Sequence, residues 1–346
     1  MAESDPLIQE KMESPAFTSA KRTPRGRPQA IAHRGYKAAH PENTMGAFKG
    51  AVEVGAHAIE TDLRLSKDGV VVDDTLKRCF GTDEKIVDCD WEYLKTLRTL
   101  EEPHEPMPRF KDLLSDTFFL HGEDLLEYLV SPGLEDIWVL LDVKIPRLKL
   151  LSPFRRKQGD QQNDGDQANK LFKAIAVTLE EVKPSRPWTE RILIGCWAVE
   201  HLPRYPIIHI GVSISYARQF LKVPGVSLNM LLMVMVGPRG KALIRDARKA
   251  NRSVFLWTVN KEPWMKWSIK KDFDGVVTDD PKKYLEICKT YEGEKIHHSL
   301  RSLLFIFSAN VLVPLYSTVV RFNYGFNVDL RKFRKGLESS TTTAAA

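Results

Sequence analysis

Acidic side chains stand at the ends of two apolar stretches of the sequence. Residues 58–62 read AIETD and end with Glu60 and Asp62, and residues 138–144 read WVLLDVK and carry Asp142. Because side chains two residues apart in a β-strand point to the same face, Glu60 and Asp62 would project together. Carboxylates that meet at one rim repel one another unless a cation lies among them, and an all-oxygen site suits Mg²⁺ or Ca²⁺ better than zinc. We therefore expect one divalent cation, Mg²⁺ or Ca²⁺, near these three acids.

A histidine and two basic side chains occupy comparable positions. The stretch 29–33 ends in His33, which Arg34 follows, and Lys144 lies two residues beyond Asp142. A histidine alone near a strand end is most often structural, but this one would share a rim with carboxylates and cations. A proton-transfer group and fixed positive charges beside a metal suit an anionic substrate with a phosphoryl centre, because they stabilise charge that develops on its oxygens.

These groups need a scaffold that brings several strand ends together. Short apolar stretches alternate with helix-like stretches, which is typical of parallel strands joined by helices in an α/β protein. Eight such stretches favour a closed (β/α)8 TIM barrel, whose strand ends point into a shared mouth, and an open doubly wound sheet is the alternative. The expected strands are residues 29–33, 58–62, 138–144, 192–197, 207–213, 226–230, 254–259 and 274–278.

The predicted barrel, residues 29–290, is interrupted and flanked by other segments. Insertions lie near residues 114–124 and at residues 145–167, and the second is polar and Gln-rich, so we expect a mobile loop there. Residues 1–28 are polar and mixed in charge, lack the apolar core of a secretory signal, and are expected to be a disordered lead. Residues 322–346 form a basic and then low-complexity tail.

Composition narrows the possible partners. The chain has 346 residues, a formal net charge of +6 and four cysteines. The cysteines are far apart and form no CxxC pair, which argues against a zinc cluster or a disulfide scaffold. The positive charge favours an anionic partner, but the basic residues are not interleaved with aromatic residues on any one element, so nucleic acid binding is not expected. No pattern indicates a protein partner.

An apolar stretch follows the predicted barrel. Residues 302–320 contain no charged residue and are flanked by Arg301 and Arg321. In a helix, this length spans about 28 Å, just enough for the hydrocarbon core of a membrane. We expect residues 300–321 to be a membrane-associating segment, which would make the protein intracellular and membrane-associated, with its barrel facing the cytosol. The alternative is a terminal helix buried against the barrel.

A series of short motifs runs through the predicted barrel in a fixed order. They are HRG at 33–35, PENT at 41–44, ExD at 60–62, KDG at 67–69, DxK at 142–144, WTVN at 257–260 and DGxxTD at 274–279. This series resembles the glycerophosphodiester phosphodiesterase family from about residue 30 to residue 287. Within that family, the sequence is most similar to the fungal phosphatidylglycerol phospholipase C branch.

The resemblance implies a fold and a metal site. The fold would be a TIM barrel of the phospholipase C-like phosphodiesterase type, with one divalent cation at its mouth. Glu60, Asp62 and Asp142 would be the metal ligands. Asp142 stands where most of the family has glutamate, so its carboxylate reaches less far by about one methylene.

The resemblance also implies roles around that site. Arg34 and Lys144 would bind the phosphodiester, and Trp257 would line the pocket, although its bulk also suits core packing. His33 would be one of two histidines that act as general acid and base. In the family, a neighbouring glycerol hydroxyl attacks phosphorus, and water then opens the cyclic phosphate.

The second family histidine is missing from its expected place. It belongs to a pattern V-x-V-x-x-His-Asp-x-x-Leu-x-Arg, whereas here VVV at 70–72 runs directly into DDTLKR at 73–78. Either Asp73 or Asp74 replaces it as proton donor, or the protein is a weakened relative, since a lost general acid costs about 10² to 10⁴ in rate. A third interpretation, which we favour, is a sequence translated across misplaced splice boundaries.

Three hypotheses for the function follow. The leading one is a metal-dependent phosphodiesterase that cleaves a glycerophospholipid, with phosphatidylglycerol giving diacylglycerol and glycerol phosphate. The second is hydrolysis of soluble glycerophosphodiesters to glycerol 3-phosphate and an alcohol. The third is a catalytically impaired barrel that binds phosphate or lipid without turnover.

Overall fold

The computed structural model describes residues 17, 19, 26–72, 76–110, 125–143, 160–196, 205–304, 306–308 and 310–312. Lys144, Asp73 and Asp74 lie outside these residues, and so does the insertion predicted near residues 114–124.

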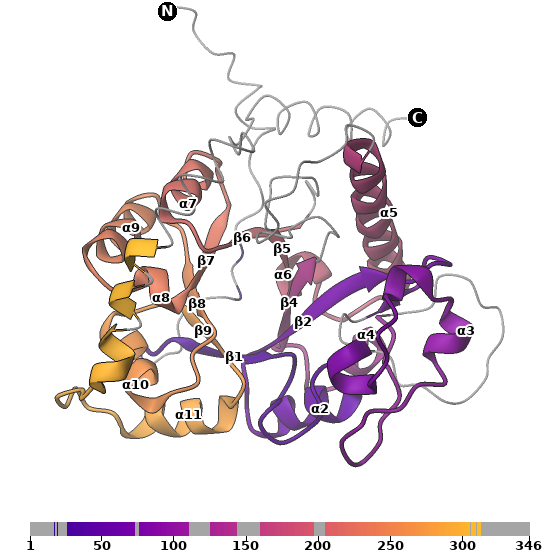
Figure 1. Ribbon diagram of the computed structural model, residues 1–346, viewed down its shortest axis with the longest axis horizontal. Helices are drawn as coiled ribbons and strands as arrows, with labels where there is room; N and C mark the ends of the chain where they lie inside the picture. The colour runs from indigo at the N-terminus through magenta and orange to yellow at the C-terminus, as the bar shows by residue number, and fades with distance from the viewer. Residues whose placement is uncertain are drawn as a thin grey trace, which may run out of the picture.

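Eight parallel strands of the described chain close into a barrel (Figure 1). Neighbouring strands pair in parallel, and β1 pairs with both β9 and β2, which closes the ring. Each strand coincides with a predicted stretch, so the TIM barrel is confirmed and the open doubly wound sheet was the wrong alternative. The strands are β1 Gln29–His33, β2 Ala58–Leu65, β4 Trp138–Val143, β5 Ile192–Cys196, β6 Ile207–Gly211, β7 Ser227–Leu231, β8 Val254–Trp257 and β9 Gly275–Thr278.

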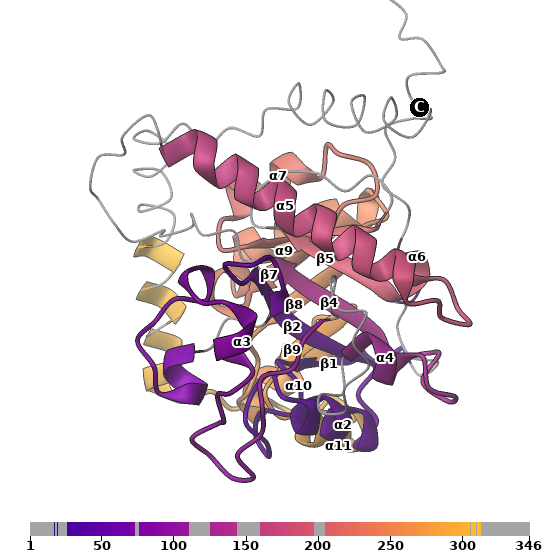
Figure 2. The same cartoon turned by 90° about the vertical axis from the view of Figure 1, so that its right-hand side faces the viewer.

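Helices cover the outside of the barrel (Figures 1 and 2). Side-chain oxygens of Thr44 and Asp280 accept backbone N–H bonds at the starts of α2 and α11, as preferred N-cap residues do. The helices are α2 Met45–Glu53, α3 Trp91–Leu94, α4 Leu125–Leu129, α5 Asp160–Glu181, α6 Trp188–Arg191, α7 Ile214–Phe220, α8 Leu232–Met235, α9 Pro238–Lys249, α10 Glu262–Lys270 and α11 Pro281–Thr290.

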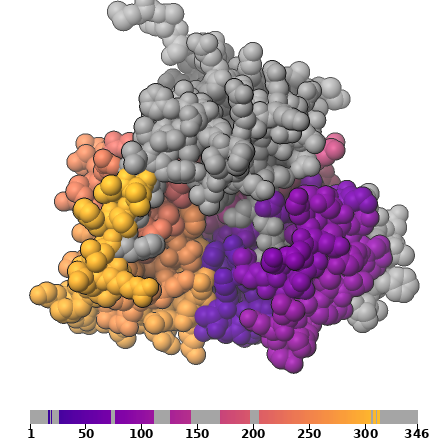
Figure 3. Space-filling model, viewed as in Figure 1, coloured from indigo at the N-terminus to yellow at the C-terminus, as the bar shows by residue number. Residues whose placement is uncertain are grey.

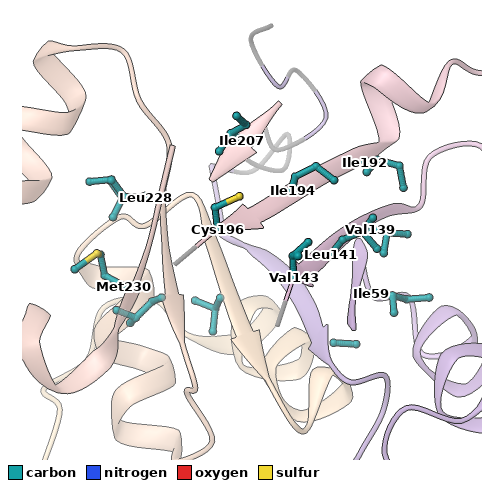
Figure 4. Packing of buried hydrophobic residues seen from close by; sticks show 14 of the residues in the cluster. Ile59, Val139, Leu141, Val143, Ile192, Ile194, Cys196, Ile207, Leu228 and Met230 are labelled. Carbon is teal, nitrogen blue, oxygen red and sulfur yellow. The ribbon is translucent and has the colours of Figure 1, made fainter. Parts of the chain in front are cut away.

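Alternate residues of each strand face opposite sides of the barrel wall. Outward residues such as Val139 and Leu228 pack under the helices (Figure 4), while inward residues such as Leu140 and Phe255 pack on one another. In such barrels, alternate strands contribute the four side chains of each inner layer. The strand pairing gives a middle layer of Glu60, Gly195, Asn229 and Val277, and a layer nearer the mouth of His33, Asp142, Ile210 and Trp257.

A small lobe stands beside β2 (purple in Figure 3). It starts with β3, Val71–Val72, which pairs antiparallel to the end of β2, and it continues through a π-helical turn at Leu76–Phe80 and a 3₁₀ turn at Ile86–Asp88. Its apolar side chains form a cluster of their own that includes Val72, Leu76 and Met107. This cluster fixes the segment that carries Arg78.

The apolar stretch after the barrel does not behave as predicted. Among the described residues, no helix combines the length and the apolar character needed to cross a membrane, so the expectation of a membrane-associated protein with a cytosolic barrel is wrong. Instead, one side of the stretch packs on the barrel: Ile306 is buried, Asn310 Nδ2 donates to the carbonyl of Met233, and Ser302 Oγ accepts from Trp264 Nε1. Residues 313–320 lie outside the described chain.

The second predicted insertion is also shorter than expected. Helix α5 begins at Asp160, so residues 160–167 are helical rather than part of a mobile loop. The sequence gives no sign of this, because residues 160–167 read DQQNDGDQ and contain no apolar side chain. A helix that extends beyond its apolar face has no hydrophobic period to reveal it.

We expect Arg191→Met to lower the free energy of unfolding by about 3 kcal/mol, since each buried carbonyl left without a donor costs about 1–3 kcal/mol. Arg191 is buried, and its guanidinium donates to the carbonyls of Ile137, Leu129 and Leu134 at 2.8–3.0 Å. The matched control is Arg248→Met, which removes an exposed arginine that also donates to backbone carbonyls. If urea unfolding showed the same loss of unfolding free energy in both variants, the burial of Arg191 would not explain its effect.

Candidate active site

His33 and Asp279 meet because β1 and β9 are neighbours. His33 Nδ1 lies 2.6 Å from Asp279 Oδ1. Because an ionised carboxylate can only accept, Nδ1 carries the ring proton and donates a hydrogen bond to Asp279. His33 Nε2 then faces the mouth, 4.0 Å from Glu60 Oε2. Burial lowers the pKa of His33, but the carboxylates of Glu60 and Asp279 outweigh it and hold the pKa above its usual value.

Asn260 holds Asp279 in turn. Its Nδ2 donates to Asp279 Oδ2 at 2.6 Å, and its Oδ1 accepts from the backbone N–H of Asp279 at 2.9 Å. Burial would raise the pKa of Asp279, but bonding to His33 and Asn260 lowers it below its usual value. The WTVN and DGxxTD motifs marked this region in the sequence, yet a contact between their last residues was not predicted.

Glu60, Asp62 and Asp142 converge at the mouth. Asp62 and Asp142 are paired across β2 and β4, and Glu60 precedes Asp62 by one strand period. Among the described residues, these three form the group that could hold a metal ion: all are buried, and one ligand atom of each lies within 4.8 Å of the others. The structure therefore brings the predicted acids together, and their donor set is the hard-oxygen type that Mg²⁺ and Ca²⁺ prefer.

Arg34 lies beside this group. Its Nε is 3.0 Å from Asp62 Oδ2, its Nη1 is 2.8 Å from Glu42 Oε1, and its backbone N–H donates to Glu60 Oε2 at 3.0 Å. The turn that allows this requires the glycine of HRG: Gly35 has φ +79°, and a Cβ there would meet the Ala47 backbone at 2.6 Å.

Glu42 of the PENT motif gathers cations at the same rim. It contacts Arg34, Lys37 Nζ at 2.5 Å and Arg78 Nε at 2.5 Å. Burial would raise the pKa of Glu42, but these neighbours outweigh it and hold the pKa below its usual value. This role was missed from the sequence, although the motif itself was noted.

Trp257 is half-buried at the end of β8, beside the inner cluster, and its Nε1 donates to the carbonyl of Asn229 at 3.1 Å. It therefore borders the mouth and also packs on the core, so its predicted pocket-lining role and the alternative of core packing both stay open. Lys144 and the site of the missing histidine are not among the described residues, so their predicted roles stay predictions.

The order of these residues can be compared with known proteins. A sequence model of the Glycerophosphoryl diester phosphodiesterase family matches residues 33–283, more than two thirds of the chain. The chain belongs to this family. It is thus a phosphodiesterase, and the resemblance is confirmed at the family level, while the fungal branch stays a prediction.

Individual relatives cover the same region. A glycerophosphodiester phosphodiesterase of Caldanaerobacter subterraneus is 25% identical over 274 residues, which are 75% of this chain and 97% of the relative. The fold is shared with a provisionally assigned family protein of Silicibacter pomeroyi, at a TM-score of 0.62 and 16% identity over 78% of this chain and 96% of the other. It is also shared with an Oleispira antarctica phosphodiesterase solved with the product sn-glycerol-3-phosphate, at a TM-score of 0.57 and 20% identity over 76% and 98% of the two chains.

We expect Asp279→Asn to lower kcat by about 10²-fold, the usual size of a general acid–base contribution. The amide would no longer fix the proton on Nδ1 of His33. Nitrogen NMR of the His33 ring should show loss of the Nδ1–H form, a change that a merely structural role would not produce. Asp272→Asn, at an exposed ion pair with Arg248, is the control and should change neither quantity.

We expect Glu42→Gln to raise KM about tenfold with a smaller change in kcat. A residue that only orients a binding group typically costs about 10- to 100-fold in affinity or activity when it is replaced. Here, that group is Arg34. Glu190→Gln, which removes an exposed carboxylate paired with Arg186, should leave KM unchanged. A fall in kcat at constant KM would show that Glu42 does not act through substrate binding.

Proposed function

We propose that this protein hydrolyses glycerophosphodiesters to a glycerol phosphate and an alcohol, with one divalent cation at the barrel mouth. The observation that carries the proposal is the group of buried acids, Glu60, Asp62 and Asp142, beside His33 and Arg34. Family membership and the product held by the Oleispira antarctica relative support this substrate class.

The residues present fit a hard divalent cation. Buried carboxylates this close repel strongly in a medium of low dielectric constant. Arg34 contacts two of them, Asp62 through its guanidinium and Glu60 through its backbone N–H. Glu60, Asp62 and Asp142 would hold the ion, Mg²⁺ or Ca²⁺, and when bound it would supply positive charge to the phosphoryl oxygens.

His33 would move the proton. With Nδ1 bound to Asp279, its Nε2 is presented to the mouth and can take the proton of the glycerol hydroxyl that attacks phosphorus. Arg34 would bind the phosphoryl oxygens through guanidinium N–H groups that Glu42 orients. Lys144 would contribute a second positive charge there, and Trp257 would cover the glycerol carbons.

Soluble glycerophosphodiesters are the better supported substrates. The Caldanaerobacter subterraneus relative carries a name that refers to glycerophosphodiesters, and the Oleispira antarctica phosphodiesterase was solved with sn-glycerol-3-phosphate. Cleavage of phosphatidylglycerol to diacylglycerol rests on the resemblance to the fungal branch alone and stays a prediction.

The direct test supplies purified protein with glycerophosphocholine and Mg²⁺ or Ca²⁺, and measures release of sn-glycerol 3-phosphate. Turnover that is abolished by His33→Ala and kept by His297→Ala, at an exposed histidine, would support the proposal. Diacylglycerol release from phosphatidylglycerol micelles, without action on glycerophosphocholine, would replace it with the lipid substrate. Binding of glycerophosphocholine without turnover would support the third hypothesis, a catalytically impaired barrel that binds its ligand without cleaving it.

We expect Mg²⁺ or Ca²⁺ at 100 times its dissociation constant to stabilise the wild-type protein by about 2.7 kcal/mol. Asp142→Asn should remove this effect and, in chelator, should make the metal-free protein more stable, because one of three repelling charges is gone. Asp136→Asn, at a fully exposed carboxylate, should behave like wild type in thermal unfolding. A metal-induced shift that survives in Asp142→Asn would contradict the assignment of this ligand.

A further inference from the structure

Asn229 faces the interior of the barrel. It lies on β7, and its register partner on β8 is Phe255, which belongs to the inner cluster. Paired residues of parallel strands share a face, while the flanking Leu228 and Met230 point outward into the helix layer (Figure 4). Asn229 is 2% exposed, so a polar amide has been placed where apolar side chains are usual.

Its height in the barrel matches that of the candidate catalytic groups. Asn229 shares the middle layer with Glu60, one of the proposed metal ligands, and the layer directly above contains His33 and Trp257. The β7 and β8 side of the barrel is thus opposite the acids of β2 and β4, at the same depth. A substrate whose phosphorus lies over β1 and β2 would extend its carbon chain toward Asn229.

The side-chain oxygen of Asn229 lacks a partner. Oδ1 is buried and, within the described residues, accepts no hydrogen bond. The indole of Trp257 donates to the backbone carbonyl of Asn229 and not to the side chain, and the layer neighbours Gly195 and Val277 have no donor to offer. A buried acceptor left in this state costs about 1–3 kcal/mol, and such groups are normally satisfied by water or a ligand.

The missing partner must be a hydrogen-bond donor. The phosphodiester itself has no proton to give, and the leaving group differs from one glycerophosphodiester to the next, whereas every one of them has glycerol hydroxyl groups. The hydroxyl next to the phosphate-bearing carbon is the nucleophile in the proposed reaction, which leaves the terminal hydroxyl. Trp257 beside Asn229 offers an aromatic face for the intervening carbons.

We propose that Asn229 accepts a hydrogen bond from the terminal hydroxyl of the substrate's glycerol, and that it thereby selects glycerol over alcohols that lack this group. The inference rests on the proposed function for its substrate class. A site built to bond a hydroxyl rejects analogues that lack it far better than an apolar pocket rejects an extra hydroxyl, so this one side chain can determine the specificity.

The test compares two product molecules by calorimetry in the presence of Mg²⁺. One is sn-glycerol 3-phosphate, and the other is propane-1,2-diol 1-phosphate, which keeps the neighbouring hydroxyl and lacks the terminal one. We expect wild-type protein to bind the first about 10- to 100-fold more tightly. In Asn229→Leu, which keeps the branched shape with somewhat larger, apolar end groups, the two should bind within about threefold of each other through loss of affinity for sn-glycerol 3-phosphate alone.

Several outcomes would overturn the inference. Equal binding of both molecules by wild-type protein would do so without any variant, and so would an equal loss for both in Asn229→Leu, which would indicate a structural role or a buried water. Asn229→Ser, which keeps a hydroxyl acceptor, should restore part of the preference. These binding results do not depend on turnover, so a protein that selects glycerol phosphate but fails to hydrolyse glycerophosphocholine would refute the proposed reaction while supporting the role of Asn229.

Discussion

The acidic side chains held close together inside the barrel constrain how the other residues of its mouth can be arranged. Two unit charges a few ångströms apart interact weakly in water and far more strongly where water is excluded. Glu60, Asp62 and Asp142 are buried with ligand atoms within 4.8 Å, and a side chain free to turn away would do so. Their strands limit this, because the closed ring of paired strands fixes the backbone from which each carboxylate projects. The rigidity of the barrel thus keeps in place an arrangement that favours a bound cation.

The basic side chains near these acids are held in place by carboxylates. Arg34 contacts Asp62 and Glu42 together, so its guanidinium is held by two carboxylates. Arg78 shares Oε1 of Glu42 with Arg34, and Lys37 contacts Oε2, so these cations hold the pKa of the buried Glu42 below its usual value. Glu42 therefore keeps positive charge at the rim, where a phosphate could meet it, while Arg34 also offsets part of the charge of Asp62.

The sequence predicts the barrel well because buried parallel strands are near-continuous apolar runs, and those runs match β1 and its partners. The acids could be placed together because a period of two fixes Glu60 and Asp62 on one face. The contact between Asn260 and Asp279 could not, since it joins two loops after different strands. The prediction for the apolar run after the barrel failed for another reason, because it was based on composition, which suits a membrane. The described part of the run is held on the barrel by Ser302, Ile306 and Asn310. Their spacing of four residues puts them on one side of a helix.

The anchoring of the lobe has a consequence for how such a barrel can change over evolution. Val72 is paired with Arg64 of β2 and bridged to Arg109, and Arg78 is tied to Glu42. Both ends of the intervening stretch are thus fixed to the barrel, and the cost of closing a loop grows only slowly with its length. Residues can be gained or lost there while Glu60, Asp62 and Asp142 stay where they are. The stretch in which the family resemblance predicts a second histidine is therefore one whose length can change independently of the three buried acids.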